Sequence, residues 1–177
     1  MFMFRNSSLV SMNPWLLMGI TIGTMIGTRM IDYETNWVAK NMMYAGFVGS
    51  MSVSMLPLIH MYSMPIIYDA LIATSVTVGG LGAVAWNAPS EQFLAWGGPL
   101  SLGLGGLCGC SLLSILYPGS KALYNVGLYG GLALFSALLL YDTQRIISDA
   151  KTMRVYDPIN SSIGVYLDAI NLFVRFV

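Results

Sequence analysis

Residues 132–173 read LALFSALLLYDTQRIISDAKTMRVYDPINSSIGVYLDAINLF, and two aspartates in this stretch stand inside otherwise apolar segments. Asp142 follows an almost unbroken apolar run, and Asp168 lies within another. An ionised carboxylate at the centre of a membrane-spanning helix costs roughly 2.5 to 3.5 kcal/mol on insertion scales. Each acid therefore needs a compensating partner, a bound proton or a function that repays this cost.

The rest of the chain has the composition of a membrane protein. Of its 177 residues, 56% are hydrophobic and only 9% are charged, whereas a soluble domain carries about 25% charged residues. The formal net charge is zero, so we expect no basic surface for nucleic acid. The two cysteines, Cys108 and Cys110, lie in an apolar run, and we interpret them as small packing residues. The sequence indicates no cofactor.

Six segments are long and apolar enough to approach the length of a membrane helix, which is about 20 residues. They run roughly over residues 15–31, 37–59, 65–86, 93–117, 122–148 and 159–177, and they are separated by breakers such as NAPSEQ and YPGSK. Nothing repeats at a fixed period, and no linker divides the chain. We therefore predict one all-α transmembrane domain over residues 1–177, a polytopic helix bundle of about six helices.

The basic residues between these segments are unevenly distributed. Successive connections between the predicted helices lie on opposite sides of the membrane. The connections on one side carry Arg29, Lys40, Arg145, Lys151 and Arg154, and those on the other side carry Arg5 and Lys121. The positive-inside rule predicts that the first side faces the cytosol or matrix. Asp142 then lies at that end of its segment, and both carboxylates belong to the inner half of the bundle.

The last segment carries a polar stripe with spacings of 3 and 4, which places its members on one helix face: Ser161, Gly164, Asp168, Asn171 and Arg175. The segment before it has a matching face: Gly127, Gly131, Phe135, Leu138 and Asp142. Residues 93–117 offer Ser101, Gly105 and Gly109 at the same spacing. Because small residues favour helix contacts in membranes, we predict that these faces pack tightly around an inward-facing acidic pair.

Two carboxylates brought together in a low dielectric do not both ionise easily, so such a pair titrates as a unit and senses pH. The same oxygens suit Ca²⁺, which takes about 6 to 8 oxygen ligands. Thr143, Asn160 and Asn171 are candidates for further ligands or hydrogen bonds. Competition between protons and Ca²⁺ at Asp142 and Asp168 is the physical basis of a proton-gated calcium pathway or a proton–calcium exchanger.

A simpler interpretation gives both acids a local partner. Arg145 lies three residues after Asp142, and Arg175 lies two turns after Asp168 on the same face. Each aspartate would then be neutralised within its own helix. Spacing alone leaves this alternative open.

Two other classes of protein deserve comparison. In an interaction protein that shapes the membrane, the small residues at Gly127 and Gly131 would form a partner interface. An intramembrane aspartyl protease would pair the YD at Tyr141 and Asp142 with a GxGD motif, but the second acid here lies in VYLDA, and a PAL element is missing. No Ser, His and Asp arrangement and no HExxH motif is present, so we expect no enzymatic activity.

The stretches LLLYDTQRIISDA and YDPINSSIGVYLDAINLFVRF resemble the paired C-terminal signatures of the transmembrane Bax inhibitor motif family. The stretches GLGAVAWNAPSEQFLAWGGPLSLGLGGL and YNVGLYGGLALFSALLLYDTQ are similar to its mitochondrial branch. The resemblance implies a seven-helix bundle in which the last two helices contribute an aspartate pair, a pH-sensitive gate for Ca²⁺. Asp142 in YDTQ and Asp168 in YLDAINLF match these positions. The family's first helix has no counterpart here, so we expect six helices of that fold.

The resemblance also implies a location and a role. It implies the mitochondrial inner membrane, with another intracellular membrane such as the endoplasmic reticulum as the alternative. It further implies calcium–proton exchange, maintenance of cristae and restraint of cell death. The partners that follow from it are the lipid bilayer, Ca²⁺ and other inner-membrane proteins.

Overall fold

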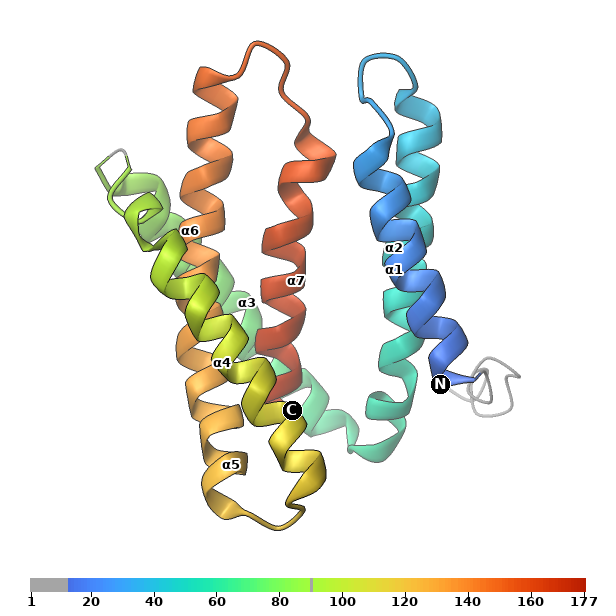
Figure 1. Ribbon diagram of the computed structural model, residues 1–177, viewed down its shortest axis with the longest axis vertical. Helices are drawn as coiled ribbons and strands as arrows, with labels where there is room; N and C mark the ends of the chain where they lie inside the picture. The colour runs from blue at the N-terminus through green and yellow to red at the C-terminus, as the bar shows by residue number, and fades with distance from the viewer. Residues whose placement is uncertain (1–12, 90) are drawn as a thin grey trace. The chain divides into compact units, whose positions relative to one another are not determined.

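The computed structural model describes residues 13–89 and 91–177, which form helices and connecting turns and contain no strand. The helices are α1 (Pro14–Met30), α2 (Trp37–Met61), α3 (Met64–Asn87), the short η2 (Leu94–Trp96), α4 (Gly97–Leu116), α5 (Lys121–Asn125), η3 (Val126–Gly130), α6 (Gly131–Thr152) and α7 (Pro158–Phe176) (Figure 1). The all-α fold class is confirmed. Arg5, one of the charges used to predict orientation, lies outside the described residues.

Within residues 13–89 and 91–177, four helical stretches are long and apolar enough to cross a membrane: Trp37–Met61, Met64–Asn87, Leu94–Leu116 and Lys121–Thr152. The protein is therefore a polytopic membrane protein. Each predicted segment overlaps one observed helical stretch. The largest difference in bounds is at the end of α6, which reaches Thr152 rather than residue 148, because polar residues continue the helix beyond its apolar run.

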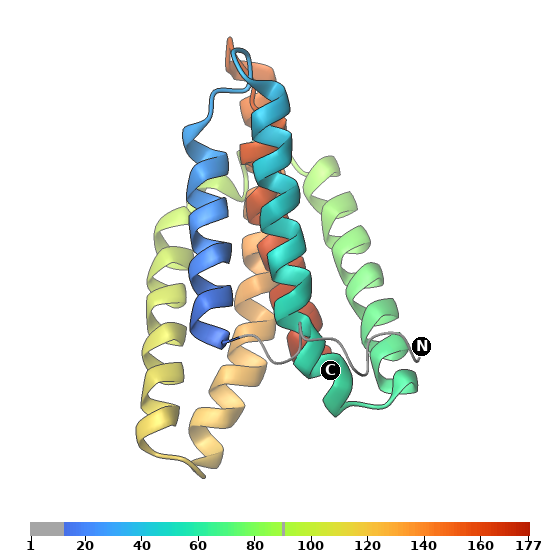
Figure 2. The same ribbon diagram turned by 90° about the vertical axis from the view of Figure 1, so that its right-hand side faces the viewer.

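The chain divides into two compact units, and the first comprises residues 13–67 together with 157–160. In this unit α1 and α2 form an antiparallel hairpin (Figures 1 and 2). The Thr21 hydroxyl donates to Ser50 Oγ at 3.0 Å between the two helices. A Cβ atom on Gly27 would meet the terminal methyl group of Met43, so a larger residue here would require that flexible side chain to move.

A buried ion pair links α2 to the beginning of α7 within the first unit. The side chain of Lys40 is completely buried, forms an ion pair with Asp157, and donates to the Ile31 carbonyl at 2.6 Å. Oδ1 of Asp157 accepts from the backbone N–H groups of Ile159 and Asn160, both at 3.1 Å, which caps the N-terminus of α7. Lys40, assigned from the sequence to an interfacial connection, is thus an internal residue.

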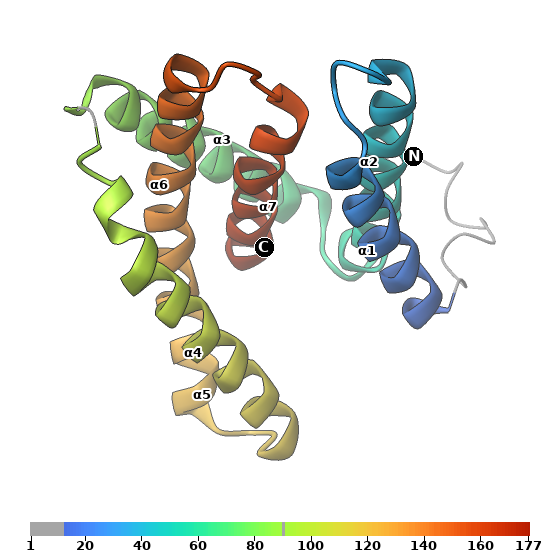
Figure 3. The ribbon, with the colours of Figure 1, turned by 45° about the horizontal axis from the view of Figure 1, so that its top comes forward.

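The second unit comprises residues 68–156 and 161–177. Its core is formed by Leu107 of α4, Phe135 and Leu139 of α6, and Leu172 of α7. In Figure 3, α4 runs beside the continuous helix formed by α5, η3 and α6, and a short turn joins the two at one end. This arrangement brings α4, α6 and α7 around one apolar cluster.

The predicted packing face of α4 was wrong. Nothing lies within 4 Å of a Cβ atom built on Gly105 or Gly109, and Ser101 is exposed. Two other residues mark the packed face: Leu107 belongs to the core, and a Cβ atom on Gly103 would lie 2.8 Å from Leu134. Because α4 is apolar or small on every side, its sequence does not distinguish one face from another.

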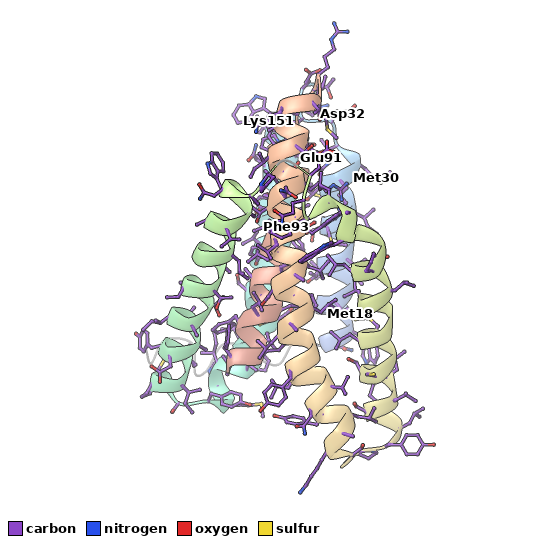
Figure 4. The ribbon with its side chains drawn as sticks, turned by 90° about the vertical axis from the view of Figure 1, so that its left-hand side faces the viewer. Met18, Met30, Asp32, Glu91, Phe93 and Lys151 are labelled. Carbon is purple, nitrogen blue, oxygen red and sulfur yellow. The ribbon has the colours of Figure 1, made fainter. Side chains whose placement is uncertain are left out.

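The connection between α3 and α4 is fastened to α6 by a buried glutamine. Gln144 is 3% exposed, its Nε2 donates to the Pro89 carbonyl at 2.8 Å, and its Oε1 accepts from the Phe93 N–H. Glu91 between these two residues has a φ of 72°, a conformation that side chains other than glycine seldom adopt. Figure 4 shows Glu91 and Phe93 beside α6, toward the end that carries Lys151.

Candidate functional site

Asp142 of α6 and Asp168 of α7 face each other in the second unit and share a side-chain hydrogen bond. Asp168 is only 5% exposed, and Asp142 is half-buried. An ionised carboxylate only accepts hydrogen bonds, so a hydrogen bond between two carboxyl groups requires one proton on the pair. Oδ2 of Asp168 is buried and has no hydrogen-bond partner among the described residues. Oδ2 of Asp168 can therefore accept a further hydrogen bond or bind a cation.

Two charged side chains on the α6–α7 faces, Asp142 and Arg175, each lie over a glycine of the opposite helix. The Asp142 carboxylate occupies the place where a Cβ atom of Gly164 would be, and the Arg175 guanidinium does the same at Gly131. The two predicted stripes thus face each other. The space left by the missing side chains is filled by the charged groups of the facing helix.

Arg175 makes contacts with neutral groups. Its Nε donates to the Gly127 carbonyl at 3.3 Å, and its Nη1 donates to the carbonyl and to Oδ1 of Asn171 at 2.9 and 3.3 Å. The guanidinium also lies 4.6 Å from the centre of the Phe135 ring, a cation–π contact. Lys40–Asp157 and Arg145–Asp149 form ion pairs that do not involve Arg175. Arg175 is therefore stabilised by carbonyls and an aromatic face.

The backbone that receives Arg175 is irregular. Val126–Gly130 forms one π-helical turn between α5 and α6, and Gly127 belongs to it. Single π turns inside α-helices often occur at functional sites. The sequence indicates this turn only through its two glycines, Gly127 and Gly130.

The local partner predicted for Asp142 is engaged elsewhere. Nε of Arg145 lies 3.7 Å from Oδ2 of Asp149, one turn further along α6, and the Arg145 side chain is 59% exposed. An exposed pair of this kind contributes little to stability. Arg145 thus has a carboxylate partner one turn further along α6.

The other predicted site residues lie in different surroundings. Asn171 donates to the Leu167 carbonyl at 2.9 Å and accepts from Arg175, so it links the polar stripe of α7 to the guanidinium. Thr143 is half-buried and, as the next residue on the helix, points about 100° away from Asp142. Asn160 belongs to the first unit, where it donates to the Arg29 carbonyl at 3.5 Å.

The donor set of the pair determines which cations it can hold. No group of three or more His, Cys, Asp or Glu side chains that could hold a metal is found in residues 13–89 and 91–177. Two carboxylates provide four oxygens, fewer than the roughly 6 to 8 that Ca²⁺ takes. A calcium ion here would complete its shell with water or backbone carbonyls, which favours transient over permanent binding.

Sequence reasoning missed two polar residues that organise the structure, Lys40 and Gln144. Both are buried and bonded to backbone carbonyls. The signal for Gln144 was present, because it follows Asp142 by two positions within YDTQ. Nothing near Lys40 in the sequence identifies its partner.

The whole chain, residues 1–177, matches the family described as "Inhibitor of apoptosis-promoting Bax1". The protein is a member of the Bax inhibitor family. It is 39% identical to the growth hormone-inducible transmembrane protein of Rattus norvegicus over 174 residues, which cover 91% of this chain and 50% of the rat protein. It is 30% identical to Bax inhibitor 1 of Arabidopsis thaliana, over 63% of this chain and 45% of the plant protein.

A bacterial relative extends the comparison. An uncharacterized protein of Campylobacter jejuni is 29% identical over 92% of this chain and 69% of its own length. This family member thus spans about half the length of the rat and plant relatives. No solved structure matches it. The family resemblance drawn from the YDTQ and YDPIN stretches is confirmed.

Proposed function

We propose that this Bax inhibitor family member carries Ca²⁺ across its membrane in a pH-dependent manner, by exchange with protons or as a proton-gated leak. One observation carries the proposal, the hydrogen-bonded contact between Asp142 and Asp168 inside a membrane protein. Intramembrane acids are costly and typically mark ion or proton pathways. Here they come from two helices, and one of them is almost fully buried.

The mechanism follows from the charge of the pair. With one proton shared, Asp142 and Asp168 carry a single negative charge and attract a divalent cation weakly. Loss of that proton leaves two negative charges at one place, which repel each other unless a cation lies between them. A rise in pH therefore favours Ca²⁺ binding, and acidification releases the ion. Asn171 and Arg175 would keep the facing surface of α7 in register.

The alternative function is a membrane scaffold without transport. Its predicted interface was the small-residue pair Gly127 and Gly131. Gly131 is buried against Arg175 of the same chain, and the Gly127 carbonyl accepts from Arg175. These contacts favour an intramolecular role for the two glycines over a partner interface.

The cellular setting belongs to the same proposal. The resemblance of the sequence to the mitochondrial branch supports the mitochondrial inner membrane, with the endoplasmic reticulum as the alternative location. The names of the relatives support a role in restraining apoptosis, and we extend it to the organisation of cristae. We expect no enzymatic activity, which a model membrane substrate left uncleaved would support.

The test is Ca²⁺ uptake by liposomes that contain the purified chain, measured from mildly acidic to mildly alkaline pH. Asp142→Asn and Asp168→Asn should each abolish the pH dependence. Asp149→Asn is the matched control, because Asp149 lies two turns from Asp142 on the same helix but pairs with Arg145. Flux that is unchanged in both pair variants would exclude the pair as the transport site, and equal loss in all three would point to damaged folding.

A further inference from the structure

The turn between α4 and α5 borders a pocket of about 570 Å³. Apart from Gly119, the lining residues are polar or aromatic, and they include one cation and no carboxylate: Ser114, Tyr117, Gly119, Ser120, Lys121, Tyr124 and Asn125. This volume is within the range of small-molecule sites, which is about 300 to 1,000 Å³. The functional site described above uses none of these residues.

The pocket lies at the turn between two helical stretches that can span the membrane, which indicates its level in the bilayer. It lies where Leu94–Leu116 ends and Lys121–Thr152 begins, and both stretches are long and apolar enough to span a bilayer. Only four residues separate them, with Gly119 in a left-handed conformation at φ 102°. Figures 1 and 3 show this turn at the end of the α4–α5 pair. The pocket therefore lies at the level of the lipid headgroups, where Tyr and Lys are characteristic.

The polar groups of the pocket are suited to an anion. Lys121 contributes three N–H donors and takes part in neither of the ion pairs found among the described residues. Ser120 Oγ accepts from the Leu123 N–H at 3.5 Å, which leaves its own proton free to donate. The phenols of Tyr117 and Tyr124 supply two further donors, and both residues are about two-thirds exposed, at 66% and 67%.

Apolar side chains continue from the pocket along α4. Leu113 lies one turn before Tyr117 on the same face and is 44% exposed, and Leu116 is 71% exposed. A ligand with a phosphate head and hydrocarbon tails matches this sequence of surfaces. A free phosphate would use only the polar end.

We propose that the pocket binds the headgroup of an anionic phospholipid, with Lys121 and the Ser120 hydroxyl on the phosphate and the acyl chains against Leu113 and Leu116. A basic residue near a membrane surface contributes about 1 kcal/mol of attraction to anionic lipid, equivalent to about a fivefold preference. The bound lipid would fasten the α4–α5 turn at the membrane surface.

The test is native mass spectrometry of the full chain after equilibration with equal amounts of dioleoyl phosphatidylglycerol and dioleoyl phosphatidylcholine. These lipids share their tails, so the ratio of bound species reports on the headgroup. We expect the wild type to prefer phosphatidylglycerol about fivefold, Lys121→Gln to lose the preference, and Lys121→Arg to retain it. Lys151→Gln is the matched control, because Lys151 is an exposed lysine at the other end of the α5–α6 helix.

Two results would overturn the proposal. One is a lipid preference that is the same in Lys121→Gln and in the wild type. The other is displacement of phosphatidylglycerol by inorganic phosphate at equal concentration, which would show that the pocket recognises free phosphate and that the acyl chains add nothing. Loss of preference in both Lys121→Gln and Lys151→Gln would also contradict it, because attraction to net charge alone would then explain the binding.

Discussion

Replacing Gly164 with alanine should push the two aspartates apart. A Cβ atom at position 164 would lie 2.9 Å from Cγ of Asp142 and 3.5 Å from its Oδ1, and nearer still to Oδ2. Ordinary contacts of a Cβ atom begin at about 3.4 Å, so Cγ must move by at least about half an ångström, and Oδ2 must move further. The direction of the shift is away from α7 and therefore away from Asp168.

Two opposing terms set the size of the effect on stability. Forcing a methyl group into a packed site costs about 1 to 3 kcal/mol, whereas replacing Gly by Ala inside a helix gains up to about 1 kcal/mol. We expect a net loss of about 1 to 2 kcal/mol, or a few degrees in Tm. Gly105→Ala on α4 is the control, because nothing lies within 4 Å of the added methyl group.

The assay combines thermal unfolding of the purified protein in detergent with Ca²⁺ uptake by liposomes. Gly164→Ala should unfold at lower temperature than Gly105→Ala and should weaken the pH dependence of uptake, since its pair no longer shares a proton. If the two variants are equally stable and both transport like the wild type, the reasoning that Gly164 makes room for Asp142 is refuted.

Two further predictions concern the buried polar residues outside the pair. Gln144→Ala removes both hydrogen bonds to the α3–α4 connection, which should cost about 1 to 3 kcal/mol and speed hydrogen exchange at the Phe93 amide; unchanged exchange would contradict this role. Lys40→Met leaves the Asp157 carboxylate without its cation, which should cost about 3 kcal/mol, the low end of the range because Asp157 keeps 22% exposure. Adding Asp157→Asn should recover much of that loss in a double-mutant cycle, and two fully additive losses would argue against the pair.

The helices and the inner face of α7 could be predicted because their signals are local. Breakers separate apolar runs, and the polar stripe that contains Asp168 and Arg175 recurs every three or four residues, so one face differs sharply from the rest. The same argument failed for α4. Its glycines fall on several sides, and only the packed structure selects Gly103 over Gly105 and Gly109.

The polar contacts could not be predicted because they join distant positions. Lys40 and Asp157 are 117 residues apart, and Gln144 is 51 residues from Phe93. A periodic pattern says which face of a helix is buried, but it does not say which polar group that face meets. The charge of Arg175 shows the same limit, since its partners are a carbonyl of a π turn and an aromatic ring rather than an acid.

The carboxylate of Asp157 performs two tasks with two different oxygens. Oδ1 receives the first free N–H groups of α7, and Oδ2 receives the ammonium of Lys40. Asparagine at this position could still cap α7 through its Oδ1 but would lose the ion pair with Lys40. Glutamate would keep the negative charge, but its longer side chain would place the carboxylate one methylene too far to cap the helix. Aspartate alone provides both the helix cap and the ion pair, so this position has no conservative replacement. A substitution of Asp157 therefore requires a compensating substitution of Lys40.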